Sequence, residues 1–310
     1  MLNRLRFSPF LAQLVVVRRC NLACKYCNEF DTTSQPVPLD ELKRRVDKLK
    51  ELGTFSIEFT GGEPMLHPGI YDLIRYAREK RFHKVMMISN AYLMNEEKVR
   101  KLNDAGLEEL QISVDGVTPN DITVKVLKPL RKKLEVIAKT AKFKVVLSGV
   151  LGAAPAADVL EVAEFAKAHG FRPRVLVLHG EDGQMKLSDE ERDMFQRVKS
   201  TIGEKRFKEA HDYRERLLNE GAAPFKCRAG SRYLYVDEFG VVHWCSQTRE
   251  EWGIPLADYD FEQLRTQFKT KKPCTAGCTV GCARTQSAPD EWRPQPLLPV
   301  GHVAPSHAAP

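Results

Sequence analysis

Hydrophobic and polar positions along the first 180 residues form blocks that predict strands and helices in turn. Residues 55–60 alternate between apolar and polar side chains, which is typical of a strand, and residues 39–52 repeat apolar side chains every three or four positions, which is typical of a helix. The predicted strands are 13–18, 55–60, 84–89, 109–114, 143–148 and 173–178, and the predicted helices are 39–52, 70–80, 95–104, 122–140 and 156–169. Six strands separated by helices predict an α/β fold with a parallel sheet.

The pattern changes after residue 180. Ser188 followed by Glu191 is a capping-box signature, which indicates the start of a helix. The elements expected beyond it are helices at 188–200 and 203–220 and a hairpin with strands at 233–236 and 241–244. The chain is therefore expected to divide into an α/β domain at 1–180, a helical linker at 181–225, a cysteine-rich module at 226–288 and a proline-rich, disordered tail at 289–310.

Composition narrows the class of protein. Of the 310 residues 43% are hydrophobic, and the formal net charge is +7. No apolar stretch approaches the roughly 20 residues that a membrane helix needs, and the N-terminus lacks a signal-peptide pattern, so we expect a cytoplasmic protein without a membrane span. The basic residues are spread over helical surfaces, and the charge gives little support for nucleic-acid binding. In a reducing compartment the eight cysteines are expected to be metal ligands rather than disulfides.

Three of these cysteines lie within eight residues, directly after the first predicted strand. Cys20, Cys24 and Cys27 form a C-x-x-x-C-x-x-C run. Three thiolates suit an iron-sulfur cluster with one open iron, whereas zinc would require a fourth protein ligand or a catalytic water. The spacing therefore favours an iron-sulfur cluster.

A second motif follows the second predicted strand. Gly61, Gly62 and Glu63 precede Pro64 at the end of residues 55–60. Paired glycines at a strand end allow the backbone to approach a ligand closely. Taken alone, the motif could also be an ordinary turn.

Together the two motifs resemble the signature of the radical S-adenosylmethionine (radical SAM) family, in which an aromatic residue, here Tyr26, precedes the third cysteine. The resemblance implies a partial (βα)6 TIM-like barrel and a SAM molecule bound to the open iron of a 4Fe-4S cluster. It assigns the cluster to Cys20, Cys24 and Cys27, the adenine contact to Tyr26, and the methionine amino group of SAM to Gly61, Gly62 and Glu63.

Polar residues at the carboxyl ends of the other strands extend this candidate site, because ligands bind at that edge of a parallel sheet. Ser113 and Asp115 resemble the segment that lines the SAM ribose or carboxylate in the family, although turn or capping roles remain open. Residues 149–152 resemble the adenine-side segment, with close packing as the alternative. The remaining strand-end candidates are Ser89, Asn90, Ser148 and His179.

The other five cysteines lie in the C-terminal module: Cys227, Cys245, Cys274, Cys278 and Cys282. Their spacing resembles the SPASM and twitch domains, which hold auxiliary 4Fe-4S clusters in some radical SAM enzymes. One cluster takes four cysteines, so the resemblance implies that Cys227 and Cys245 are joined by two of the last three. The spare thiol is either structural or a hydrogen donor to a substrate radical. A structural zinc site is the alternative for the whole module.

The function implied by the resemblance is reductive cleavage of SAM to a 5'-deoxyadenosyl radical, which abstracts a hydrogen atom from the substrate. We expect the electron to come from a flavodoxin- or ferredoxin-like protein, and the auxiliary cluster to accept an electron during oxidative modification of a ribosomal peptide. Only about a dozen residues precede the first predicted strand, so a separate protein would recognise the peptide. The alternatives are an enzyme that acts on a small alcohol, sugar or lipid precursor, and a non-catalytic iron-sulfur or zinc protein.

Overall fold

A nine-stranded sheet forms the centre of the computed structural model, which describes residues 6–27, 30–178, 188–202, 212–249 and 251–300. Six consecutive strands are parallel and follow the chain order, and the last three extend the sheet beyond β1. In spatial order the strands are β6 (Arg172–Val177), β5 (Lys144–Leu151), β4 (Glu109–Ser113), β3 (Lys84–Ser89), β2 (Ser56–Gly61), β1 (Leu11–Val17), β7 (Tyr233–Val236), β8 (Val241–His243) and β9 (Ile254–Pro255). The predicted α/β fold with a parallel sheet is confirmed.

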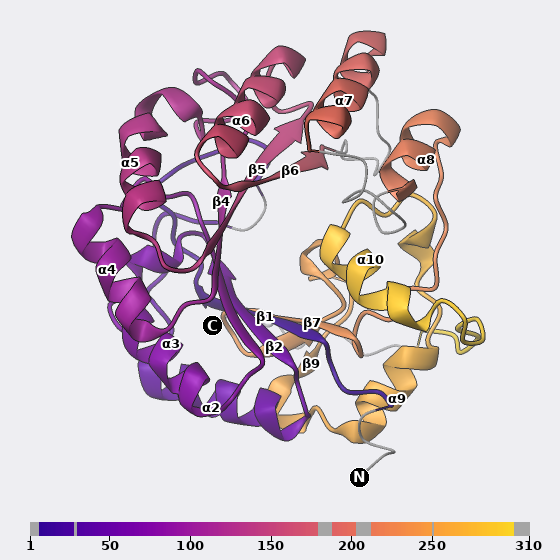
Figure 1. Cartoon of the computed structure of the whole chain (residues 1–310). Helices are drawn as coiled ribbons and strands as arrows, with labels where there is room; N and C mark the ends of the chain where they lie inside the picture. Colours follow the sequence, from indigo (N-terminus) through magenta and orange to yellow (C-terminus); the bar gives the residue numbers. More distant parts are fainter. Residues whose placement is uncertain (1–5, 28–29, 179–187, 203–211, 250, 301–310) are drawn as a thin grey trace.

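Helices cover the outer side of the curved sheet, as Figure 1 shows. They are α2 (Leu39–Glu51), α3 (Ile70–Glu79), α4 (Glu96–Ala105), α5 (Leu127–Thr140) and α6 (Ala156–Ala168). In α2 the apolar side chains of Leu42, Val46 and Leu49 are fully buried, as the helical spacing predicts. Each helix therefore packs an apolar stripe onto the outer side of the strands. None of these five helices covers the inner side of the sheet.

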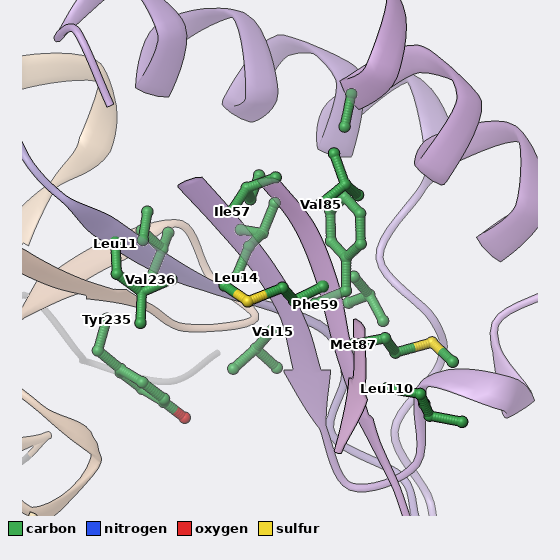
Figure 2. Packing of buried hydrophobic residues seen from close by; sticks show 14 of the residues in the cluster. Leu11, Leu14, Val15, Ile57, Phe59, Val85, Met87, Leu110, Tyr235 and Val236 are labelled. Atoms are coloured by element: carbon green, nitrogen blue, oxygen red, sulfur yellow. The ribbon is translucent and has the colours of Figure 1, made fainter. Parts of the chain in front are cut away.

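The outward-facing side chains of the strands form the main hydrophobic core together with these helices. Leu14 of β1 is in register with Phe59 of β2, which is in register with Met87 of β3, and all three are fully buried. Figure 2 shows part of this packing, with Leu14, Ile57 and Phe59 close together on neighbouring strands. Because strand side chains alternate between faces, Gln13 and Glu58 point to the opposite, inner side.

The predicted helix at 122–140 begins five residues late, at Leu127. Residues 122–126 lie outside the helix, Val126 forms a β-bridge with Gly116, and the backbone N–H of Asp115 donates to the carbonyl of Lys125 at 2.7 Å. This tertiary contact outweighs helix propensity. The sequence carried a signal for it, because Ile122, Val124 and Val126 are β-branched residues at alternate positions, a pattern typical of extended chain.

The cysteine-rich module continues the same sheet. β7 pairs in parallel with β1 and in antiparallel with β8, which confirms the predicted hairpin. The helices of this half are α7 (Asp189–Ile202), α8 (Asp212–Glu220), α9 (Phe261–Lys269) and α10 (Gly281–Ser287). Short 3-10 turns lie at Pro64–Leu66, Ser246–Thr248, Leu256–Asp258, Pro273–Thr275 and Ala288–Asp290. The first part of the helix expected at 203–220, residues 203–211, lies outside the described residues.

The chain does not leave the fold at residue 289, where a disordered tail was expected. Asp290 is buried and forms an ion pair with Arg232, with Nε and Oδ2 2.6 Å apart. Leu298 pairs with Thr270 through a β-bridge. A buried carboxylate and a backbone pairing hold this segment in place, which composition alone did not indicate. Residues 301–310 lie outside the described part.

No helix in the described part of the chain is long and apolar enough to cross a membrane.

Candidate functional site

The first cysteine run forms a compact loop after β1. The backbone N–H of Cys20 donates to the carbonyl of Asp31 at 3.0 Å, and the N–H of Cys27 donates to the carbonyl of Cys24 at 3.1 Å. The sulfur of Cys20 accepts from the N–H of Leu22 and, at 3.6 Å, from Nδ2 of Asn90. Cys24 is buried, whereas Cys20 and Cys27 are half-buried. The loop thus places its three thiols at the carboxyl edge of the sheet.

Gly61 and Gly62 bring the end of β2 against the chain that leads into this loop. A Cβ on Gly62 would lie 2.2 Å from the carbonyl oxygen of Arg18 and 2.5 Å from that of Arg19. A Cβ on Gly61, where φ is 141°, would lie 2.0 Å from the carbonyl oxygen of Val17. Contacts this short exclude any side chain at both positions. In this structure the glycines permit close approach to protein backbone, next to Cys20.

Glu63 ties the ends of β2 and β3 together beside Cys20. Its carboxylate accepts hydrogen bonds from the N–H of Met65 at 3.0 Å, the hydroxyl of Ser89 at 2.8 Å and the N–H of Asn90 at 2.7 Å. Burial raises the pKa of Glu63 in spite of these donors. Burial also raises the pKa of the Cys20 thiol, and repulsion from Glu63 adds to that effect. Glu63, Ser89, Asn90 and Cys20, all selected from the sequence, therefore meet at one place.

Asp115 forms a second buried centre on the other side of the cysteine loop. Its Oδ2 accepts from the hydroxyl of Tyr26 at 2.8 Å and from the hydroxyl of Thr123 at 2.7 Å, and it lies 3.5 Å from Nζ of Lys125. Its Oδ1 is buried and has no hydrogen-bond partner among the described residues. An acceptor in that state is available to a donor from a bound molecule.

Thr123 and Lys125 belong to this site although no sequence motif marked them. The hydroxyl of Thr123 lies 3.7 Å from the sulfur of Cys24, and Nζ of Lys125 lies 4.7 Å from the centre of the Tyr26 ring and contacts its hydroxyl. Burial opposes the charge of Lys125, but Asp115 and Tyr26 raise its pKa, so the ammonium stays charged. Both residues were hidden by the expected helix at 122–140.

The other strand-end candidates form no hydrogen bond with the thiols in the described part of the chain, or lie outside that part. Ser113 is half-buried at the end of β4, in register with Ser148 of β5. A Cβ on Gly149 would lie 3.1 Å from Cγ1 of Val159 in α6, so close packing against that helix requires a small residue there. This contact favours the packing alternative for residues 149–152. His179 lies outside the described residues.

Four of the five C-terminal cysteines act on one another electrostatically. Burial raises the pKa of the Cys245, Cys274 and Cys278 thiols, to about 12 for Cys278, and repulsion from Cys227 adds to each. Cys227 and Cys245 are buried; Cys227 precedes β7 in the sequence and Cys245 follows β8. These four thiols form one group, which we call the module thiols.

Cationic groups surround the module thiols. Lys272 is 1% exposed, and burial lowers its pKa to about 8, while the neighbouring Cys227 and Cys274 favour its charged form. Arg284 donates from Nε to the carbonyl of Cys278 at 2.8 Å. Positive groups of this kind favour thiolates over thiols.

Cys282 contacts residues on the inner face of the sheet. Nε2 of Gln13 approaches its sulfur to 3.7 Å, and Arg174 donates a hydrogen bond to it. Burial raises its pKa, and repulsion from Glu58 adds to the effect. The sequence placed Cys282 in the same run as Cys274 and Cys278, but its side chain faces the inner side of the parallel sheet.

The residues fit the groups that the resemblance implies. Among the described residues, no three cysteine, histidine or acidic side chains converge as the ligands of a single metal ion would. Each cysteine of a 4Fe-4S cluster binds a different iron, so a cluster does not require that convergence. Three thiols flanked by the orphaned Oδ1 of Asp115, and four thiols flanked by cations, are donor sets of the right chemistry.

Comparisons with known proteins agree with this geometry. The chain is 32% identical over 145 residues to PqqA peptide cyclase of Bradyrhizobium diazoefficiens, covering 45% of this chain and 38% of that protein. It is 30% identical over 209 residues to GTP 3',8-cyclase of Aliarcobacter butzleri, covering 61% of each. The chain thus spans less than two thirds of the length of these relatives.

Solved structures share the fold. Streptococcus suis SuiB bound to its precursor peptide SuiA has a TM-score of 0.66 at 15% identity, covering 89% of this chain and 72% of that one. The structure of anSMEcpe with bound AdoMet and a peptide has a TM-score of 0.59 at 16% identity, covering 92% of this chain and 98% of that one. Residues 14–197, more than half of the chain, match the radical SAM superfamily, and with the parallel sheet and the thiols at its carboxyl edge they show that this chain belongs to that superfamily.

Proposed function

We propose that this chain is a radical SAM enzyme in which Cys20, Cys24 and Cys27 hold a 4Fe-4S cluster and SAM binds beside it. When bound, these groups supply reductive cleavage of SAM to a 5'-deoxyadenosyl radical that abstracts a hydrogen atom from the substrate. The observation that carries the proposal is that Cys20 and Cys24, in one loop with Cys27, are connected through Asn90 and Thr123 to two buried carboxyl groups, Glu63 and Asp115. Glu63 is connected to the Cys20 end of the loop through Asn90, and Asp115 is connected to Cys24 through Thr123.

The residues around SAM take complementary roles in this proposal. Glu63 fixes the ends of β2 and β3, and with Gly61 and Gly62 it forms the side that receives the methionine amino group. Asp115 offers its orphaned Oδ1 to a hydroxyl or amino donor of SAM, while Tyr26 and Lys125 hold the other oxygen. Ser113 is half-buried at the same edge and completes the proposed set.

We propose further that the module thiols bind an auxiliary 4Fe-4S cluster of the SPASM or twitch kind. The set is Cys227, Cys245, Cys274 and Cys278, and it leaves Cys282 as the spare thiol. Cys227 raises the pKa of the other three thiols, and this effect and the cations beside them support the assignment. A thiol whose pKa is about 12, such as that of Cys278, is protonated at neutral pH, so metal binding must displace its proton.

The proposed substrate is a ribosomal peptide, oxidised with the auxiliary cluster as electron acceptor. Similarity to a PqqA peptide cyclase and to the fold of SuiB, which was solved with its precursor peptide, supports this choice. A small-molecule substrate is the second candidate, because the similarity to a GTP 3',8-cyclase covers a longer part of the chain. A flavodoxin- or ferredoxin-like donor would supply electrons in a reducing cytoplasm, and a separate protein would present a peptide.

The test uses protein that has been purified and reconstituted without oxygen. Iron, sulfide and SAM cleavage under dithionite are measured in the parent and in a variant carrying Cys20→Ala, Cys24→Ala and Cys27→Ala. Two clusters correspond to about eight irons per chain, and we expect the triple variant to keep about four and form no 5'-deoxyadenosine. About four irons in the parent, all lost in the variant, would remove the auxiliary cluster, and bound zinc without SAM cleavage would refute the whole proposal.

A further inference from the structure

A group of polar side chains on the inner side of the sheet, two of them buried and one half-buried, has no role in the function proposed above. Arg174 comes from β6, Tyr213 and Arg214 come from α8, and Gly281 begins α10. We call Arg174, Tyr213 and Arg214 the inner-face polar group. It lies on the opposite side of the strands from the helix-packed core and next to Cys282.

The three side chains converge on one point. A Cβ placed on Gly281 would lie 3.0 Å from Nη2 of Arg174, 3.3 Å from the hydroxyl of Tyr213 and 3.5 Å from Nη2 of Arg214. Two guanidinium groups and a hydroxyl thus surround a position where the chain carries no side chain. Any larger residue at Gly281 would displace them.

The side chains around Gly281 carry mainly positive charge, from Arg174 and Arg214. Arg174 donates from Nη1 to the neutral amide oxygen of Gln111 at 2.7 Å and makes no ion pair within the described residues. Arg214 is 4% exposed, and burial lowers its pKa, with repulsion from Arg174 and Arg284 adding to the effect. The two guanidinium groups repel each other at this distance, and an anion bound between them would relieve that repulsion.

Two buried hydroxyl groups are unsatisfied beside these cations. The hydroxyl of Tyr213, a residue 9% exposed, has no hydrogen-bond partner among the described residues. The same holds for the hydroxyl of Ser148, which is in register with Arg174 on the neighbouring strand and faces the same side. Buried hydroxyls are normally hydrogen-bonded, and both can donate to an oxyanion.

We propose that the inner-face polar group, with Ser148, binds an oxyanion of the substrate, either a carboxylate or a phosphate. The inference deepens the proposed function, because it names the chemical class of substrate that the radical site would act on. Charge-assisted hydrogen bonds from guanidinium groups are the strongest that a protein can offer to such an anion. Glu58 lies close enough to act on Arg174, but burial raises its pKa and reduces its competition for the cations.

Two probes separate the possible sources of the oxyanion. Sodium phosphate represents a phosphorylated substrate such as a nucleotide, and sodium glutarate represents an acidic side chain or the carboxyl terminus of a peptide. Binding is measured by calorimetry on reconstituted holoprotein with saturating SAM, so that the SAM carboxylate occupies its own site, and sodium chloride at equal ionic strength is the reference.

The variants are Arg174→Gln and Tyr213→Phe, with Arg44→Gln as the matched control on the exposed surface of α2, where the side chain is 70% exposed. Tyr213→Phe keeps the ring that packs 4.3 Å from the guanidinium of Arg284 and removes only the unpartnered hydroxyl, so its melting temperature should equal that of the parent. It therefore tests binding without a folding defect.

We expect saturable binding of one probe, weakened at least about tenfold by Arg174→Gln, a few-fold by Tyr213→Phe, and unchanged by Arg44→Gln. Phosphate binding alone would point to a phosphorylated small molecule, and glutarate binding alone to an acidic peptide. The proposal is overturned if neither probe binds better than chloride, or if both variants bind like the parent. SAM cleavage by the parent, measured on the same sample, reports separately on the proposed function.

Discussion

The sulfur of Cys282 lies 3.7 Å from Nε2 of Gln13, although 269 positions separate the two residues in the sequence. Gln13 belongs to β1 and Cys282 to α10, so the contact brings the C-terminal module onto the inner face of the parallel sheet. The groups that act most strongly on the charge of Cys282 are Glu58 and Arg174 rather than the module thiols. Cys282 is therefore surrounded by residues of the inner face of the sheet.

This separation predicts different results for two cysteine-to-serine variants. Cys282→Ser should retain the iron of the parent, whereas Cys227→Ser should lose about four irons, the content of one cluster. Iron and sulfide analysis after anaerobic reconstitution gives the measurement. Equal loss of iron from both variants would show that Cys282 is a ligand.

Lys125 is predicted to be needed for the side of the site formed by Tyr26 and Asp115. Lys125→Met leaves the buried carboxylate without its cation, a change that costs about 3–5 kcal/mol when one member of a buried pair is removed. We expect a melting temperature lower by several degrees and weaker SAM binding by calorimetry. Lys128→Met, three positions later and exposed in α5, is the control and should behave like the parent. An unchanged melting temperature for Lys125→Met would contradict the ion pair.

Gly62 is predicted to tolerate no side chain. Gly62→Ala forces a Cβ to within 2.2 Å of the carbonyl oxygen of Arg18, and backbone atoms cannot rotate away as a side chain can. The same Cβ would lie 2.5 Å from the carbonyl oxygen of Arg19, the residue before Cys20, so the variant should lose both stability and the iron of the first cluster. Gly170→Ala is the control, since φ there is +75° but no atom lies within 4 Å, so it should cost only about 1 kcal/mol of backbone strain. Equal melting temperatures for the two variants would count against the close approach.

Glu58 is predicted to make stability depend on pH. Burial raises its pKa, although Gln13 donates to Oε2 at 2.6 Å. The folded protein therefore holds this proton at pH values where the unfolded chain has released it, and the unfolding free energy falls as the pH rises above the ordinary value of 4.5.

Glu58→Gln removes this loss. The variant should therefore melt above the parent at pH 8, and the difference should shrink at pH 5. Thermal melts at both values provide the measurement, with Glu79→Gln on an exposed surface as the control. A difference that is larger at pH 5 than at pH 8 would reverse the sign and reject the explanation.

The parallel sheet and half of the site could be predicted from the sequence because their signals are local. The run from Cys20 to Cys27 and the motif ending at Glu63 each follow a strand, and the carboxyl ends of parallel strands share one edge. Ser89 and Asn90 joined Glu63 for the same reason.

The remaining features depend on contacts between distant segments. Thr123 and Lys125 reach the site only because residues 122–126 stay out of the helix and pair with Asp115. Cys282 contacts Gln13 on the inner face of the sheet, and that contact is set by the placement of α10 rather than by spacing. The ion pair between Arg232 and Asp290 likewise holds a segment whose composition indicated disorder.

The pairing of β7 with β1 also affects whether the α/β half of the chain would stay soluble if it were separated from the cysteine-rich module. β1 carries the loop of the first cysteines, and without β7 its outer edge would present a row of unpaired N–H and carbonyl groups. Such an open edge is a template for pairing with another chain. The cysteine-rich module therefore covers the open edge of β1 and should reduce aggregation of the α/β half. A chain cut before residue 226 would expose the backbone of β1, its most apolar strand, to pairing with other chains.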